Sequence, residues 1–163
     1  VEERDTIIKR LEAQGLQVLP VDDLEYHRIN NGMPTWGREL DENTLPQEAR
    51  LEDQAVDFHK GCYVGQEVVS RIKSVGRVNR RLFGLESDNL LSSGMVLAPE
   101  NSPETPVGSI TSVSPVFGLS KWIGMGYVKH GFDLPGGRLL ASNPENGLQT
   151  SVRMREFPID TAL

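Results

Sequence analysis

Residues 107–114 read VGSITSVS, a stretch that predicts a short β-strand. Other candidate strands after residue 73 span residues 75–85, 95–98, 123–129, 138–141 and 149–154. Turn signals separate them, namely SSG at 92–94, PGG at 135–137 and NPENG at 143–147. About six short strands at this spacing predict a small, closed antiparallel barrel.

The chain before residue 73 has a different, mixed pattern. Ile7, Ile8 and Leu11 recur at helical spacing, and Gly15 is a suitable residue to end that helix. Residues 16–19 (LQVL) then predict a strand. Such an abrupt opening, without a methionine, leads us to expect a fragment of a larger protein.

A second helix is predicted just before the barrel. Val64, Val68, Val69 and Ile72 recur at helical spacing after two glycines, Gly61 and Gly65. The fold class predicted for the whole chain is therefore α+β. A partial α/β unit covers residues 1–72 and the barrel covers residues 73–163.

Composition limits the function classes. The 163 residues carry a formal charge of −6, which provides no general attraction for a nucleic-acid backbone. A single cysteine, Cys62, cannot form an internal disulfide, and no apolar run approaches the length that spans a bilayer. We therefore expect a cytoplasmic protein, or one of the mitochondrial matrix, with no direct nucleic-acid or membrane partner.

The densest cluster of chemically useful residues is FHKGCYVGQE at 58–67. Its two glycines allow tight turns, and Lys60 and the following helix N-terminus bring positive potential close to Cys62. Such surroundings favour the thiolate, the nucleophilic and metal-ligating form of cysteine. A small buried apolar residue is the alternative interpretation of Cys62. The stretch is neither a Walker A loop nor a dinucleotide-binding glycine motif.

The same segment resembles the K-G-C-[FY]-x-G-Q-E signature of YgfZ-type folate-binding proteins, within the glycine-cleavage T-protein (aminomethyltransferase) superfamily. Five further stretches resemble that family: RINNGMP through GRE at 28–39, LPQE at 45–48, Arg71, GRVNRRL at 76–82 and VGSITS at 107–112. The resemblance implies that residues 1–72 are the C-terminal part of the folate-binding domain. It also implies that an N-terminal half of the same protein is missing.

Tetrahydrofolate, or a folate derivative, is the cofactor that the resemblance implies. Its contacts would come from seven residues: Arg28, Asn30, Glu39, Tyr63, Gln66, Glu67 and Arg71. Asn30 stands where the family has glutamate. An amide offers one acceptor and one donor group to a pterin, whereas a carboxylate offers acceptors only.

The activity that the resemblance implies is assembly or repair of iron–sulfur clusters in client enzymes, including tRNA-modifying ones. Cys62 would be the reactive or transiently ligating thiolate, and Lys60 would tune it. One cysteine cannot hold a stable cubane cluster, which needs about four thiolates, so transient action with client or assembly proteins is expected. No metal site is expected from His27, His59 and His130, which lack zinc-ligand spacing.

Two alternatives stay open from the sequence. The first is a tetrahydrofolate-dependent aminomethyltransferase of the glycine cleavage system, which would not depend on Cys62. The second is a non-catalytic binding module whose barrel docks a partner protein.

Overall fold

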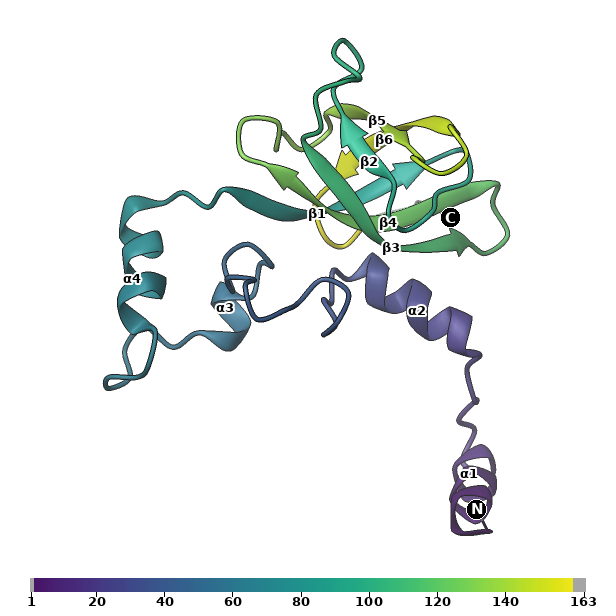
Figure 1. Ribbon diagram of the computed structural model, residues 1–163. Helices are drawn as coiled ribbons and strands as arrows, with labels where there is room; N and C mark the ends of the chain where they lie inside the picture. Colours follow the sequence, from purple (N-terminus) through teal and green to yellow (C-terminus); the bar gives the residue numbers. More distant parts are fainter. Residues whose placement is uncertain (1, 160–163) are drawn as a thin grey trace.

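The computed structural model describes residues 2–159, without the side chains of residues 2 and 73–75. Its helices are α1 (Glu2–Glu12), α2 (Val21–Asn30), α3 (Glu52–Ala55) and α4 (Gln66–Val75). Its strands are β1 (Arg80–Ser87), β2 (Val96–Ala98), β3 (Gly108–Val116), β4 (Lys121–Lys129), β5 (Arg138–Ser142) and β6 (Gln149–Arg155). All helices thus precede all strands among the described residues, as Figure 1 shows.

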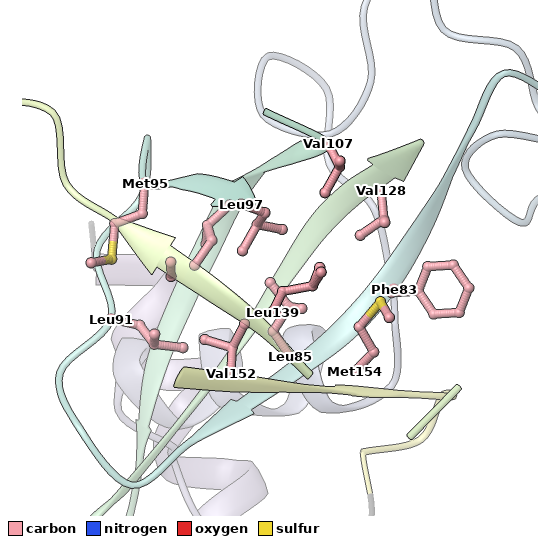
Figure 2. Close-up of a cluster of buried hydrophobic side chains, with 12 residues drawn as sticks. Phe83, Leu85, Leu91, Met95, Leu97, Val107, Val128, Leu139, Val152 and Met154 are labelled. Carbon is pink, nitrogen blue, oxygen red and sulfur yellow. The ribbon is translucent and has the colours of Figure 1, made fainter. Parts of the chain in front are cut away.

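The six strands close into an antiparallel barrel in the order β1-β4-β3-β2-β5-β6, with β6 pairing back to β1. This confirms the α+β class and the predicted small barrel. Alternate residues of each strand point inward, so Leu97, Leu139 and Val152 meet in the interior, as Figure 2 shows. Burial of this apolar surface is the main driving force for closing the barrel.

The first strand begins later than predicted. Residues 75–79 were expected to be part of it, but α4 continues to Val75 and ends at Gly76, which has a φ of +75°. Glycine adopts this left-handed conformation at little cost, and its N–H donates to the Ile72 carbonyl. The expected domain boundary between residues 72 and 73 falls inside this helix, and the division into domains stays a prediction.

The predicted strand at residues 16–19 was wrong. Helix α1 forms as expected and ends in a Schellman motif, in which the Gly15 and Leu16 amides donate to the carbonyls of Glu12 and Leu11. Residues 16–19 then run exposed to solvent without regular structure, because no described segment offers them a partner strand. Before β1, only an isolated bridge between Trp36 and Leu40 interrupts the helices and turns of the described residues.

Helix α2, which the sequence analysis missed, covers the outer face of the barrel. It packs on β3 and β4 (Figure 1), and its Ile29 is fully buried. A second apolar cluster forms at this junction from the outward-facing side chains of three strands and two flanking residues: Leu82, Val116, Ile123, Met125, Tyr127, Ile29 and Ile159. The last of these also donates its amide to the Asn30 carbonyl.

Close strand contact at Gly108 gives a test of the barrel. A Cβ at this position would lie 2.1 Å from the Tyr127 carbonyl oxygen, so the backbone itself must move. We expect Gly108→Ala to lower the free energy of unfolding by about 1–3 kcal/mol in urea titrations. Gly61→Ala is the control, because a Cβ there meets nothing within 4 Å among the described residues. Equal stability of both variants would contradict the described register.

Candidate functional site

The loop that connects α3 to α4 carries the cysteine. The Cys62 side chain is exposed, which excludes the alternative of a small buried apolar residue. Gly65, at a φ of +87°, forms the N-cap of α4 with no side-chain capping bond. The Lys60 ammonium lies 4.8 Å from the ring centroid of Tyr63, a cation–π distance. The loop therefore presents its thiol to solvent, on the segment that also carries Lys60 and leads into α4.

The other predicted residues of this segment lie on the loop and the adjoining helix. Gln66 and Glu67 form the first turn of α4, and Arg71 lies further along the same helix. Tyr63 is half-buried, and its hydroxyl is enclosed without a hydrogen-bond partner among the described residues. A buried hydroxyl without a hydrogen bond costs about 1–3 kcal/mol of stability compared with one that is hydrogen-bonded. A partner group that bonds to Tyr63 here would therefore be favourable.

A cleft of about 750 Å³ opens beside the loop, between α3, the end of α4 and the approach to β1. Lys60 lines it, together with apolar groups from Val56, Phe58 and Ile72. Three enclosed polar atoms that lack partners among the described residues belong to lining side chains: Gln47 Oε1, Glu52 Oε2 and Arg81 Nε. Gln47 is 7% exposed, and its amide nitrogen donates to the Val69 carbonyl at 2.9 Å.

The size and lining of this cleft suit a ligand or a partner side chain. Its volume lies within the range of small-molecule sites, and it combines apolar walls with both donor and acceptor atoms. Unsatisfied buried polar atoms are uncommon in folded proteins, and here three of them line one cleft. None of these three residues was among the predicted site residues. Gln47 and Arg81 fall in stretches that resemble the family, but no local pattern shows that these side chains line one cleft.

Arg28 and Glu39 meet under the barrel in a buried ion pair. Arg28 Nη1 donates to Glu39 Oε2 at 3.0 Å, and the Glu39 side chain is fully enclosed. Ser112 of β3 bridges them, since its hydroxyl accepts from Arg28 Nη2 at 2.6 Å and donates to Glu39 Oε1 at 2.5 Å. The amide of Thr35 also donates to Glu39.

Every N–H group of Arg28 is engaged within the chain. Besides Glu39 and Ser112, its partners are both carboxylate oxygens of Glu25 and the Met33 carbonyl. Burial alone would lower the pKa of Arg28, but the neighbouring carboxylates outweigh it and raise this pKa above its usual value. The hydrogen bond from Arg28 holds the pKa of Glu25 below its usual range, against the opposing effect of burial.

These contacts test whether the predicted folate residues fit a pterin. Arg28 has no N–H donor left for a ligand, and the Glu39 side chain is enclosed. This pair therefore makes its contacts within the protein rather than with a cofactor. Asn30 differs, because its side-chain oxygen is buried without a partner among the described residues. As a set, the three residues do not fit a folate pocket in this chain, and their role in cofactor binding stays a prediction.

The predicted site residues fall into two separate groups. Figure 1 shows α2, with Arg28 and Asn30, on one side of α3, and α4 with the cysteine loop on the other. Within residues 2–159, no cluster of three or more His, Cys, Asp or Glu side chains is arranged to hold a metal ion. Over the same residues, no helix has the length and apolar character needed to cross a membrane.

Comparison with known proteins finds iron–sulfur cluster assembly factors and aminomethyltransferases among the relatives of this chain. No family model matches the chain. A mitochondrial IBA57 iron–sulfur cluster assembly factor homologue of Mycosarcoma maydis is 44% identical over 69 residues, which cover 40% of this chain and 17% of that protein. Human mitochondrial IBA57 is 38% identical over 45% of this chain and 21% of its own length. An aminomethyltransferase of Halothermothrix orenii is 33% identical over 67% of this chain and 30% of its own length.

The fold agrees with these relatives. The glycine cleavage system aminomethyltransferase T of Bartonella henselae superposes with a TM-score of 0.69 at 18% identity, over 80% of this chain and 36% of that one. The chain is thus homologous to iron–sulfur assembly factors and to aminomethyltransferases, which supports the aminomethyltransferase superfamily. The YgfZ branch in particular stays a prediction. The chain spans less than a third of the length of each of these three sequence relatives.

Tyr127 offers a pH test of the junction between α2 and the barrel. Its hydroxyl donates to the Glu39 carbonyl at 2.9 Å, and burial raises the pKa of Tyr127 to about 12 from a usual value of 10.0. The neutral hydroxyl is therefore favoured in the folded state. Its contribution to stability is fully present below pH 10 and is lost as the pH rises through about 12.

Tyr127→Phe removes this titrating group. We expect the difference in the free energy of unfolding between the natural protein and Tyr127→Phe to shrink by up to about 2 kcal/mol between pH 9 and 12. Urea titrations at several pH values measure it. A difference that stays constant over this range would show that the hydroxyl is not enclosed.

Proposed function

We propose that this chain is the thiol-bearing part of a factor for the assembly or repair of iron–sulfur clusters in client enzymes, tRNA-modifying ones among them. Supporting the proposal are two relatives that are assembly factors, 44% and 38% identical over 40% and 45% of this chain. The observation that carries it is the exposed thiol of Cys62, on a glycine-bounded loop that also carries Lys60 and leads into α4.

The loop suits a transient rather than a permanent role. An exposed thiol can approach a cluster or a thiol held by another protein. One thiolate supplies about a quarter of the protein ligands of a cubane cluster, so client or assembly proteins must supply the rest. In this proposal the cluster is cargo, and Cys62 contacts it only during hand-over.

The adjoining cleft supports the proposal from a second direction. Its unsatisfied atoms at Gln47, Glu52 and Arg81 lie in the same part of the molecule as the loop, and Lys60 lines the cleft. A partner group or small ligand seated there would satisfy these atoms and fix the approach of a client to Cys62. We propose this cleft as the place where the loop meets its partner.

Tetrahydrofolate, or a folate derivative, enters the proposal only as a cofactor of the whole protein. Because Arg28 and Glu39 are engaged with one another, we assign no step of the activity to folate. The mitochondrial location of the named assembly factors supports the mitochondrial matrix as one location for this protein, and the cytoplasm is the alternative.

A second candidate is an aminomethyltransferase of the glycine cleavage system. The specific observation in its favour is the Halothermothrix orenii relative, whose match covers more of this chain than those of the named assembly factors. This activity requires turnover of an aminomethyl donor and does not require Cys62. A binding module without catalysis would need neither the turnover nor the thiol.

Genetic rescue distinguishes these functions. In cells that lack the protein, we would supply its full-length natural form, Cys62→Ser or Val64→Ser, and measure the activity of a [4Fe–4S] enzyme. Val64 is the matched control, because it is fully exposed and lies two residues from Cys62. We expect Val64→Ser to restore activity fully and Cys62→Ser to lose at least about tenfold, as loss of a required ligand predicts.

Two measurements serve as controls for folding and expression: the protein level by immunoblot, and the activity of an enzyme that carries no cluster. Full rescue by Cys62→Ser would exclude the thiol-dependent proposal and leave the binding module. Turnover of aminomethyl-lipoate by the purified full-length protein, unchanged in Cys62→Ser, would establish the aminomethyltransferase instead.

A further inference from the structure

A cleft of about 340 Å³ on the outer face of the barrel gathers four basic side chains from neighbouring strands. They are Lys121 of β4, Arg138 of β5, and Arg153 and Arg155 of β6. Strand β1 lies between β4 and β6 and contributes Glu86 to the same cleft. This site is separate from the cysteine loop, and nothing in the proposed function uses it.

Glu86 neutralises two of the four cations. Its Oε1 accepts from Lys121 at 2.8 Å, and its Oε2 accepts from Arg155 Nε at 2.7 Å. Burial would raise the pKa of Glu86, but these two cations outweigh it and hold this pKa below its usual value. Both carboxylate oxygens are therefore occupied, and Glu86 is ionised at neutral pH.

The other two cations, Arg138 and Arg153, face each other without a counter-ion. They are direct cross-strand neighbours in the pairing of β5 with β6, and both side chains are exposed. Neither has an ion-pair partner among the described residues. Arg153 is also directly opposite Glu86 in the pairing of β1 with β6, but the oxygens of that carboxylate are bonded to Lys121 and Arg155.

Such an arrangement is unfavourable in the absence of a ligand. Like charges directly opposite one another on a sheet are destabilising, since their Cβ atoms lie only about 5 Å apart. Acidic groups nearby do not cancel the excess: Asp88 lines the cleft, and Glu100 is held by the Ser151 hydroxyl at 2.7 Å. Cations outnumber carboxylates in the cleft lining, although the whole chain carries a charge of −6.

We propose that this cleft binds a small phosphate-bearing anion between Arg138 and Arg153. Two guanidinium groups on one face can each donate two parallel N–H bonds, the geometry that matches phosphate oxygens. The ligand must be compact, because the cleft is near the small end of ligand sites and the net negative charge of the chain opposes a long polyanion. A bound phosphate group would turn the arginine repulsion into two attractive contacts.

The test compares thermal unfolding of the chain with pyrophosphate and with sodium chloride at equal ionic strength. Pyrophosphate is expected to raise Tm, and chloride is not, because screening alone adds little once the ionic strength is matched. Arg138→Gln and Arg153→Gln should each weaken pyrophosphate binding about tenfold in titration calorimetry, as loss of a charge-assisted contact predicts. Arg10→Gln on α1 is the charge-matched control and should bind as the natural chain does.

The Tm without pyrophosphate is a second measurement, in which the arginine substitutions should not lower stability. Removal of one arginine relieves the repulsion, so Arg153→Gln should have a Tm equal to or above that of the natural chain in chloride, yet should gain less Tm from pyrophosphate than the natural chain does. An equal rise in both salts, or a pyrophosphate effect that survives both substitutions, would overturn the proposal. Inorganic phosphate and citrate, tested in parallel, separate a phosphate site from a general anion site: tighter binding of citrate would also overturn it.

Discussion

The arrangement of this molecule depends on the buried contact between Arg28 and Glu39. A fully enclosed carboxylate is costly unless it is paired, and here it is paired with a guanidinium whose N–H groups are all engaged. Because Ser112 bonds both partners, the pair also joins the segment around α2 to strand β3 of the barrel. Tyr127 of β4 adds a further hydrogen bond between the barrel and this segment, from its hydroxyl to the Glu39 carbonyl.

A second set of contacts carries this anchoring toward the cysteine loop. Glu48 binds Arg80 at 2.9 Å, and its carbonyl accepts from the Leu82 amide, so residues 45–51 are tied to β1. Arg50 donates to the Leu82 carbonyl and lies 4.5 Å from the ring centroid of Phe83. Polar contacts thus hold the cleft and the segment that leads to the loop against the barrel. Val68 of α4 is exposed, and no described side chain of this helix is fully buried.

The barrel and helix α4 could be predicted because strand alternation and helical spacing are local patterns. The prediction of a strand at residues 16–19 was wrong because a strand needs a partner strand, and no local pattern shows whether one is present. Helix α2 has only one buried residue, Ile29, so its apolar periodicity is too weak to detect. The partners of Arg28 lie up to 84 residues away, as Ser112 does, and neither that bridge nor the facing pair Arg138 and Arg153 could be found without the strand register.

A double-mutant cycle on Arg28 and Glu39 tests the central claim most directly. The free energy of unfolding would be measured in urea for Arg28→Gln, Glu39→Gln and the double variant, with Arg38→Gln as an exposed control whose partner is Glu25. The account predicts that each single change at the buried pair costs about 3 kcal/mol, that the double variant costs clearly less than their sum, and that the control costs under about 1 kcal/mol. Additive effects, or a buried change no costlier than the control, would contradict it.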